Sequence, residues 1–198
     1  MALQTLSADF EVYALGLYKL MNNVWNKGDL VNGVDFTQSV TFDTASTQRG
    51  VTFNWDWPDS GNGSVYSYPE IIAGYKAWDE NGPLTLSARV DEVKSLDVSF
   101  DLAIGGATGG FNVAMEFWLT SKANGVGKDI TTEVMVWLHD GDNRPAGTVI
   151  GHYDDGVYSG DIYLQENMGD ASGNDPLTWR YIAIAIDAEN YLAGSIDL

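Results

Sequence analysis

Short runs in which apolar and polar residues alternate dominate this chain of 198 residues. Successive side chains of a β-strand point to opposite faces, so such runs predict strands with one buried face. Clusters of Gly, Asn and Asp, such as DSGNG and DENGP, separate the runs and predict turns. We expect ten strands, at residues 39–44, 50–57, 64–75, 84–90, 95–104, 111–121, 131–140, 147–153, 161–166 and 178–187.

Many short strands without a long helical period predict an all-β fold, either a two-sheet sandwich or a jelly roll. We expect at most one short helix, beginning at residues 194–198 with Ser195 as its N-cap. The sequence shows no repeat, linker or low-complexity block. One domain spanning residues 1–198 is therefore expected.

The strand expected at 131–140 holds a carboxylate among apolar residues. One face is apolar throughout, and the other carries Glu133, Met135 and Trp137. The strand at 111–121 repeats this pattern, with Glu116 and Trp118 on one face. A carboxylate in so apolar a strand is costly unless its face is wet, paired or functional.

Composition narrows the choice of partners. Acidic residues outnumber basic residues by 28 to 10, which gives a net charge of −18 and disfavours nucleic acid and anionic membranes as partners. Seven Trp and ten Tyr suit either a sandwich core or a surface that stacks on sugars. The absence of cysteine excludes disulfides and thiolate metal sites. No cofactor and no metal are expected, and His139 and His152 are expected at the surface or in loops.

A pair of carboxylates beside tryptophans suits glycoside hydrolysis, which needs one carboxylate at the anomeric carbon and a second carboxyl group to protonate the leaving oxygen. A single Glu in a strand more often faces solvent, and tryptophans in sandwiches are mostly core residues. The residues alone therefore indicate a β-sandwich with a possible role in saccharide binding.

Seven segments, taken in order, resemble glycoside hydrolase family 12, the small β-jelly-roll endoglucanases. The segments are NNVWNKG (22–28), FNWDWP (53–58), VYSYPEI (65–71), NVAMEFWL (112–119), TEVMVWL (132–138), RPAG (144–147) and WRYIAIAI (179–186). The resemblance covers nearly the whole chain and implies a jelly roll with a concave glycan-binding groove.

The resemblance also implies roles for individual residues. Glu133 would be the nucleophile of a retaining mechanism, and Glu116 an auxiliary carboxylate where the family usually has Asp. The residues expected to bind substrate are Asn23, Trp25, Trp55, Tyr68, Met135 and Trp137, with Trp57 less clearly assigned.

The general acid of the family lies on a final strand, in a Gly-x-Glu-type motif, and we find no such motif in the last third of this chain. We expect the domain to be incomplete at its C-terminus, or this version to have lost the acid. Glu70, Glu166 and Glu189 are the candidates for a substitute. A missing strand would leave an unpaired sheet edge, which a second copy could cover, so a monomer or a weak homodimer is expected.

We therefore expect a retaining endo-β-1,4-glucanase that acts on cellulose, mixed-linkage glucan or xyloglucan. The alternative is a non-catalytic glucan-binding domain. A polysaccharide lyase fits poorly, because ten basic residues are few for binding an acidic polymer. Polymeric substrate implies an extracellular location, although the N-terminus lacks the pattern of a signal peptide and no apolar run reaches about 20 residues.

Overall fold

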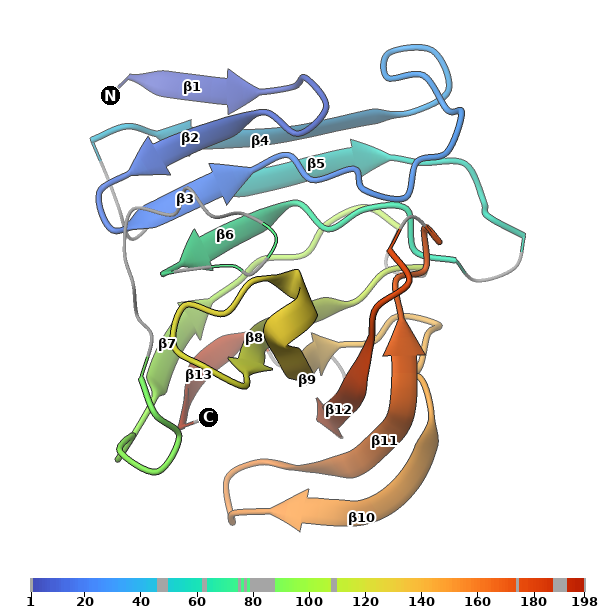
Figure 1. Ribbon diagram of the computed structural model, residues 1–198. Helices are drawn as coiled ribbons and strands as arrows, with labels where there is room; N and C mark the ends of the chain where they lie inside the picture. The colour runs from blue at the N-terminus through green and yellow to red at the C-terminus, as the bar shows by residue number, and fades with distance from the viewer. Residues whose placement is uncertain are drawn as a thin grey trace. The chain divides into compact units, whose positions relative to one another are not determined.

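The computed structural model describes residues 2–45, 50–61, 64–74, 76, 78, 88–107, 110–173, 175–186 and 192–197. These residues form thirteen strands and a single 3-10 turn, Gly127–Asp129 (Figure 1). They divide into two compact units, one formed by Met1–Ser87 with Ala171–Asp175 and the other by Ala88–Asp170 with Pro176–Leu198. The expectation of one domain over 1–198 stays a prediction.

The first unit contains two antiparallel three-stranded sheets, with strand orders β1-β4-β5 and β2-β3-β6. Its strands are β1 (Leu3–Leu6), β2 (Val12–Leu15), β3 (Tyr18–Met21), β4 (Thr37–Asp43), β5 (Thr52–Asp56) and β6 (Glu70–Ala73). Alternate apolar residues of both sheets form its core: Leu6, Leu15, Leu20, Val40 and Phe42. Burial of these side chains is the main source of stability of the unit.

The second unit contains a five-stranded sheet of order β10-β11-β12-β9-β8 and a two-stranded sheet of β7 and β13. Its strands are β7 (Asp97–Asp101), β8 (Val113–Thr120), β9 (Ile130–His139), β10 (Thr148–Asp154), β11 (Ser159–Gly169), β12 (Thr178–Ile186) and β13 (Ala193–Asp197). All neighbours pair antiparallel except β12 and β9, which are parallel. Among the described strands, β8 and β10 are the edges of the larger sheet.

The core of the second unit lies between its two sheets. Val136 and Leu138 of β9 pack with Ile196 of β13, and Val98 and Phe100 of β7 pack against them. This confirms the predicted apolar face of the strand at 131–140. The opposite face of the five-stranded sheet, which carries Glu133, points away from this core.

Several expected elements differ from the structure. The helix expected at 194–198 is wrong: Ala193–Asp197 is strand β13, because pairing with β7 buries Ile196 in the core and outweighs the capping propensity of Ser195. Of the strand expected at 64–75, residues 64–74 are described, and among these only Glu70–Ala73 form a strand. In the run at 84–90, residues 84–87 lie outside the described residues, and 88–90 do not form a strand.

Strands β1, β2 and β3 were not expected from the sequence. Each has only four residues, too few for alternation to stand out from neighbouring turns. No helix among the described residues is both long and apolar enough to span a membrane.

Candidate active site

Strand register places the expected catalytic residues on one face of the five-stranded sheet. Glu133 of β9 pairs with Trp118 of β8 on one side and with Tyr181 of β12 on the other. Two residues further along β9, Met135 pairs with Glu116 of β8 and Ala183 of β12. Paired residues point to the same side of a sheet, so these side chains form one surface. We call it the Glu133 face, and its members include Glu116, Trp118, Glu133, Met135, Trp137, Trp179 and Tyr181.

Glu133 is buried and held by a neighbouring indole. Its side chain is 9% exposed, and its Oε2 accepts a 2.7 Å hydrogen bond from Nε1 of Trp179. Trp179 precedes Tyr181 by two residues in the parallel strand β12, so its ring lies diagonally beside Glu133. The carboxylate of Glu133 thus faces an aromatic surface and is hydrogen-bonded to it.

Glu116 is the second carboxylate of this face. It is exposed, and its Oε1 accepts a short hydrogen bond from Nε1 of Trp118 on the same strand. Since Glu116 pairs with Met135, it is a diagonal neighbour of Glu133 on adjacent strands, a relation that separates residues by about 7–8 Å. The structure therefore brings together the four residues of this unit that the sequence indicated, Glu116, Glu133, Met135 and Trp137.

Sequence reasoning missed the contribution of β12 to this face. Trp179 and Tyr181 are both buried there, at 8% and 3% exposure. In residues 178–186, Trp, Tyr and Ala alternate with Arg and Ile. That alternation is the same signal that identified the faces of β8 and β9, and it was available in the sequence.

Trp137 carries a buried polar atom that lacks a partner. The side chain is 7% exposed, and its indole N–H finds no acceptor among the described residues. Its neighbours in register are Ala114 and Ala185, which are small. A buried donor left unpaired costs about 1–3 kcal/mol, and such atoms need an explanation beyond packing.

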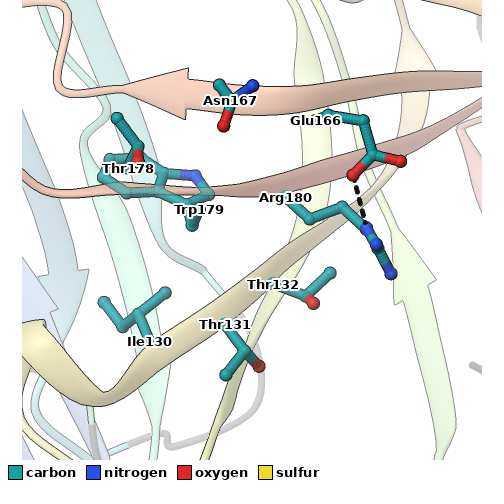
Figure 2. A pocket seen from close by; sticks show the side chains of 8 residues that line it. All are labelled: Ile130, Thr131, Thr132, Glu166, Asn167, Thr178, Trp179 and Arg180. Atoms are coloured by element: carbon teal, nitrogen blue, oxygen red, sulfur yellow. Dashed lines mark hydrogen bonds and ion pairs between the residues drawn. The ribbon is translucent and has the colours of Figure 1, made fainter.

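A pocket of about 400 Å³ lies at one end of β9, β11 and β12 (Figure 2). It is lined by Ile130, Thr131, Thr132, Glu166, Asn167, Thr178, Trp179 and Arg180. Nε of Arg180 donates a 3.0 Å hydrogen bond to Oε2 of Glu166, and both side chains are more than half exposed, so the ion pair adds little stability.

Arg180 points to the side of β12 opposite Trp179 and Tyr181, because side chains alternate along a strand. The carboxylate of Glu166 lies on that same side of the sheet, because it accepts the hydrogen bond from Arg180. Glu166 is thus a poor candidate for an acid that works with Glu133. Glu189, another candidate, lies outside the described residues.

The first unit holds a separate polar cluster around Glu70. Oε1 of Glu70 accepts a 2.8 Å hydrogen bond from Nδ2 of Asn23, and Oε2 accepts a 2.6 Å bond from Nζ of Lys76. Lys19 is 5% exposed, and burial lowers its pKa, against the opposing effect of the Glu70 charge and with the help of Lys76. Both oxygens of Glu70 are engaged within its own unit, which disfavours it as a general acid.

Asn23 keeps one polar atom unpaired. The residue is 8% exposed, and its Oδ1 has no donor among the described residues. Asn22, beside it, is fully buried and has a structural role, because its Nδ2 donates hydrogen bonds to the carbonyl oxygens of Ala8 and Gln38. Of the two adjacent asparagines, Asn23 is the one with capacity for a ligand.

The tryptophans of the first unit differ in accessibility. Trp55 is 43% exposed, whereas Trp57 lies between two rings, with centroids 3.7 Å from Phe36 and 5.0 Å from Tyr66. Trp57 is therefore engaged in stacking within the protein, which disfavours it as a residue that stacks on a sugar. Trp25 and Tyr68 are half-buried.

The two histidines also differ. His139 is 6% exposed and lies within strand β9, where its ring packs on Phe111 at a centroid distance of 4.6 Å, so the expectation that it lies at the surface or in a loop is wrong. His152 is exposed on β10, and its Nδ1 lies 3.2 Å from Oδ1 of Asp161. Within the described part of the chain, no group of three or more His, Asp or Glu side chains is arranged to hold a metal ion.

Comparison with known proteins agrees with this arrangement. Residues 16–176 match the model of the family described as glycosyl hydrolase family 12. The chain is 31% identical over 148 residues to Endoglucanase S of Pectobacterium parmentieri, and the alignment covers 72% of this chain and 52% of that protein. The chain thus spans about half the length of this curated relative.

Solved structures share the fold. The native family 12 xyloglucanase from Bacillus licheniformis matches with a TM-score of 0.80 and 22% identity, over 98% of this chain and 80% of that one. Endoglucanase 3 of Trichoderma harzianum matches with a TM-score of 0.74 and 19% identity, over 98% and 77% of the two chains. The predicted all-β jelly roll is confirmed. With most of its length matched by the family model and a relative above 30% identity, the chain belongs to glycosyl hydrolase family 12.

Proposed function

We propose that this chain is the catalytic part of a retaining endo-β-1,4-glucanase with Glu133 as its nucleophile. The observation that carries the proposal is the placement of Glu133, buried on the face turned away from the core and hydrogen-bonded to an indole at 2.7 Å. A buried carboxylate on such a face is a candidate for chemistry because burial alone would disfavour its charge. The names of the similar proteins, two endoglucanases and a xyloglucanase, support a β-glucan as the substrate class.

In the proposed mechanism, an oxygen of Glu133 attacks the anomeric carbon. The bond from that carbon to the leaving oxygen breaks, and the leaving oxygen takes a proton from a general acid. Water, deprotonated by the conjugate base of that acid, then attacks the glycosyl-enzyme ester and releases the sugar with its configuration retained. Glu116 is proposed as the auxiliary carboxylate, one strand away from Glu133 on the same face.

Two buried, unpaired atoms support the proposed substrate contacts. In the second unit, a sugar hydroxyl would accept from the indole N–H of Trp137; in the first unit, a sugar hydroxyl would donate to Oδ1 of Asn23. Both residues are more than nine-tenths buried, so substrate would restore hydrogen bonds that the free protein lacks. The proposed set of binding residues also includes Trp25, Trp55, Tyr68 and Met135. Because the proposed substrate is a polymer, we also propose an extracellular location.

The experiment uses a substrate that needs no general acid. The leaving group of 2,4-dinitrophenyl β-cellobioside departs without protonation, so kcat/KM for its release reports the attack by the nucleophile without a contribution from the general acid. We expect release by the wild-type chain and a loss of at least about 1,000-fold in Glu133→Gln, with an unchanged unfolding midpoint. Glu133→Ala with added azide should give the glycosyl azide of inverted configuration.

Rates of hydrolysis then give the preference among three soluble polymers: mixed-linkage glucan, xyloglucan and carboxymethylcellulose. Endo action is recognised by a fall in viscosity that precedes the release of reducing ends. If Glu133→Gln releases dinitrophenol as fast as the wild type, Glu133 is not the nucleophile. Saturable binding of cello-oligosaccharides without any release would instead identify a glucan-binding domain.

A further inference from the structure

Two indoles and two carboxylates form a connected cluster on the Glu133 face. Trp179 donates to Glu133, and Trp118 donates to Glu116. The rings of Trp118 and Trp179 meet edge to face, with centroids 5.4 Å apart and planes at 72°. The side chains come from β8, β9 and β12, so the two rings meet across the strand that carries Glu133.

The contact to Glu133 is not a simple consequence of core packing. Trp179 is 8% exposed on the side of the sheet away from the core, and its single polar atom is directed at one carboxylate oxygen. A hydrogen bond from a neutral donor to a carboxylate is stronger than one between neutral groups, and it favours the ionised form. It also restricts the orientation of the glutamate side chain, because the accepting oxygen is held at the indole N–H.

We infer that Trp179 is a positioning residue for Glu133, fixing the orientation of its carboxylate and favouring its charged form. This inference rests on the proposed role of Glu133 as nucleophile. Trp118 supports Trp179 through the edge-to-face contact, and aromatic pairs in this geometry contribute beyond the area that they bury. A neutral indole orients the nucleophile without pairing it to a cation, which would lower its reactivity toward the anomeric carbon.

The test compares Trp179→Phe with the wild type on 2,4-dinitrophenyl β-cellobioside. Phenylalanine keeps an aromatic ring against Trp118 and removes the N–H that Glu133 accepts. We expect kcat to fall about 10- to 100-fold, as for the loss of one hydrogen bond to a charged group, with KM changed less than about threefold. The acid limb of kcat/KM should move to higher pH, because the ionised form of Glu133 loses a donor.

Trp78→Phe is the matched control. The indole of Trp78 also donates to a carboxylate, Oδ2 of Asp175 at 3.4 Å, but this pair is exposed in the first unit. The control should keep both kcat and the pH profile of the wild type. A Trp179→Phe variant that is folded and shows the kcat and acid limb of the wild type would overturn the inference while leaving the role of Glu133 intact.

A second readout depends neither on activity nor on the folding of Trp179→Phe. In ¹H–¹⁵N spectra of the wild-type chain, the indole resonance of Trp179 should shift as Glu133 titrates, and it should lose that shift in Glu133→Gln. The resonance of Trp78 should be the same in both proteins. An indole resonance of Trp179 that is insensitive to pH and to Glu133→Gln contradicts the inference. Failure of the proposed function is recognised separately, by a wild-type chain that releases no dinitrophenol.

Discussion

Trp57 stacks on Phe36 with ring planes inclined by only 8°, and it also stacks on Tyr66 with ring planes inclined by 13°. Its Nε1 donates a 2.9 Å hydrogen bond to Oε1 of Gln38, which also accepts from the hydroxyl of Ser67 at 2.6 Å. Gln38 in turn donates to Oδ1 of Asn22. Trp57 thus closes a polar network beside the core of the first unit and has a structural role.

We predict that Trp57→Ala lowers the free energy of unfolding by about 3 kcal/mol, since it removes two ring contacts and leaves Gln38 with a lost donor. Urea unfolding followed by fluorescence measures this change. Trp55→Ala serves as the control, because that side chain is 43% exposed and should change stability by less than about 1 kcal/mol. Equal destabilisation by both substitutions would contradict the structural role of Trp57.

Glu116 and Glu133 are diagonal neighbours, so a negative charge on Glu116 disfavours a second negative charge on Glu133. Glu116→Gln removes that charge, so the acid limb of kcat/KM should move to lower pH. This shift is opposite in sign to the one expected for Trp179→Phe. Glu116→Asp, which restores the residue usual in the family, keeps the charge and should leave the acid limb of kcat/KM unchanged. If Glu116→Gln does not shift the acid limb, the two carboxylates do not interact.

Gly147 occupies a position that no other residue fits. Its φ is +90°, and an added Cβ would lie 2.1 Å from the backbone oxygen of Leu164 on β11. We predict that Gly147→Ala costs at least about 3 kcal/mol of stability, because backbone strain and a backbone clash combine. Gly156 has a φ of +84° but nothing within 4 Å of its added Cβ, so Gly156→Ala should cost only about 1–2 kcal/mol. Thermal or chemical unfolding of the two variants tests the difference, and equal costs would exclude the clash.

Asp155, in the turn between β10 and β11, makes stability depend on pH. Hydrogen bonds from the backbone N–H groups of Tyr158 and Val157, and then from the hydroxyl of Tyr153, lower the pKa of this carboxyl. A carboxyl whose pKa is lower in the folded state stabilises the fold above its unfolded pKa of about 3.9, and this contribution is lost as pH falls through the folded pKa.

The thermal midpoint of Asp155→Asn should therefore lie below that of the wild type at pH 5–7, and the gap should close as pH falls below about 3.9. Thermal unfolding between pH 2 and 7 measures the gap. Asp142→Asn, an exchange at an exposed position, provides the control for a general change in net charge. If the difference in thermal midpoint stays constant to the lowest pH, the effect of the substitution comes from side-chain shape and not from ionisation.

The class of the fold and the faces of β8 and β9 could be predicted from the sequence. Alternation is a local property of an extended backbone, so Val136 and Leu138 were assignable to a core and Glu133 to the opposite face from position alone. The resemblance of the ordered motifs to family 12 supplied the roles proposed for Glu133 and Glu116. The identity of the family was confirmed by comparison, whereas the roles of the residues stay predictions.

Only the tertiary structure decided which residues act on one another. Glu133 and Trp179 are separated by 46 residues in the sequence, and they meet because β12 pairs in parallel with β9 in one particular register. Trp55 and Trp57 look alike in the sequence, yet Trp55 is 43% exposed while the rings of Phe36 and Tyr66 stack on Trp57. Residues 194–197 carry a helix-start signal that strand pairing with β7 overrides. In each case the deciding energy comes from pairing and burial between remote segments, and no local pattern encodes which segments will meet.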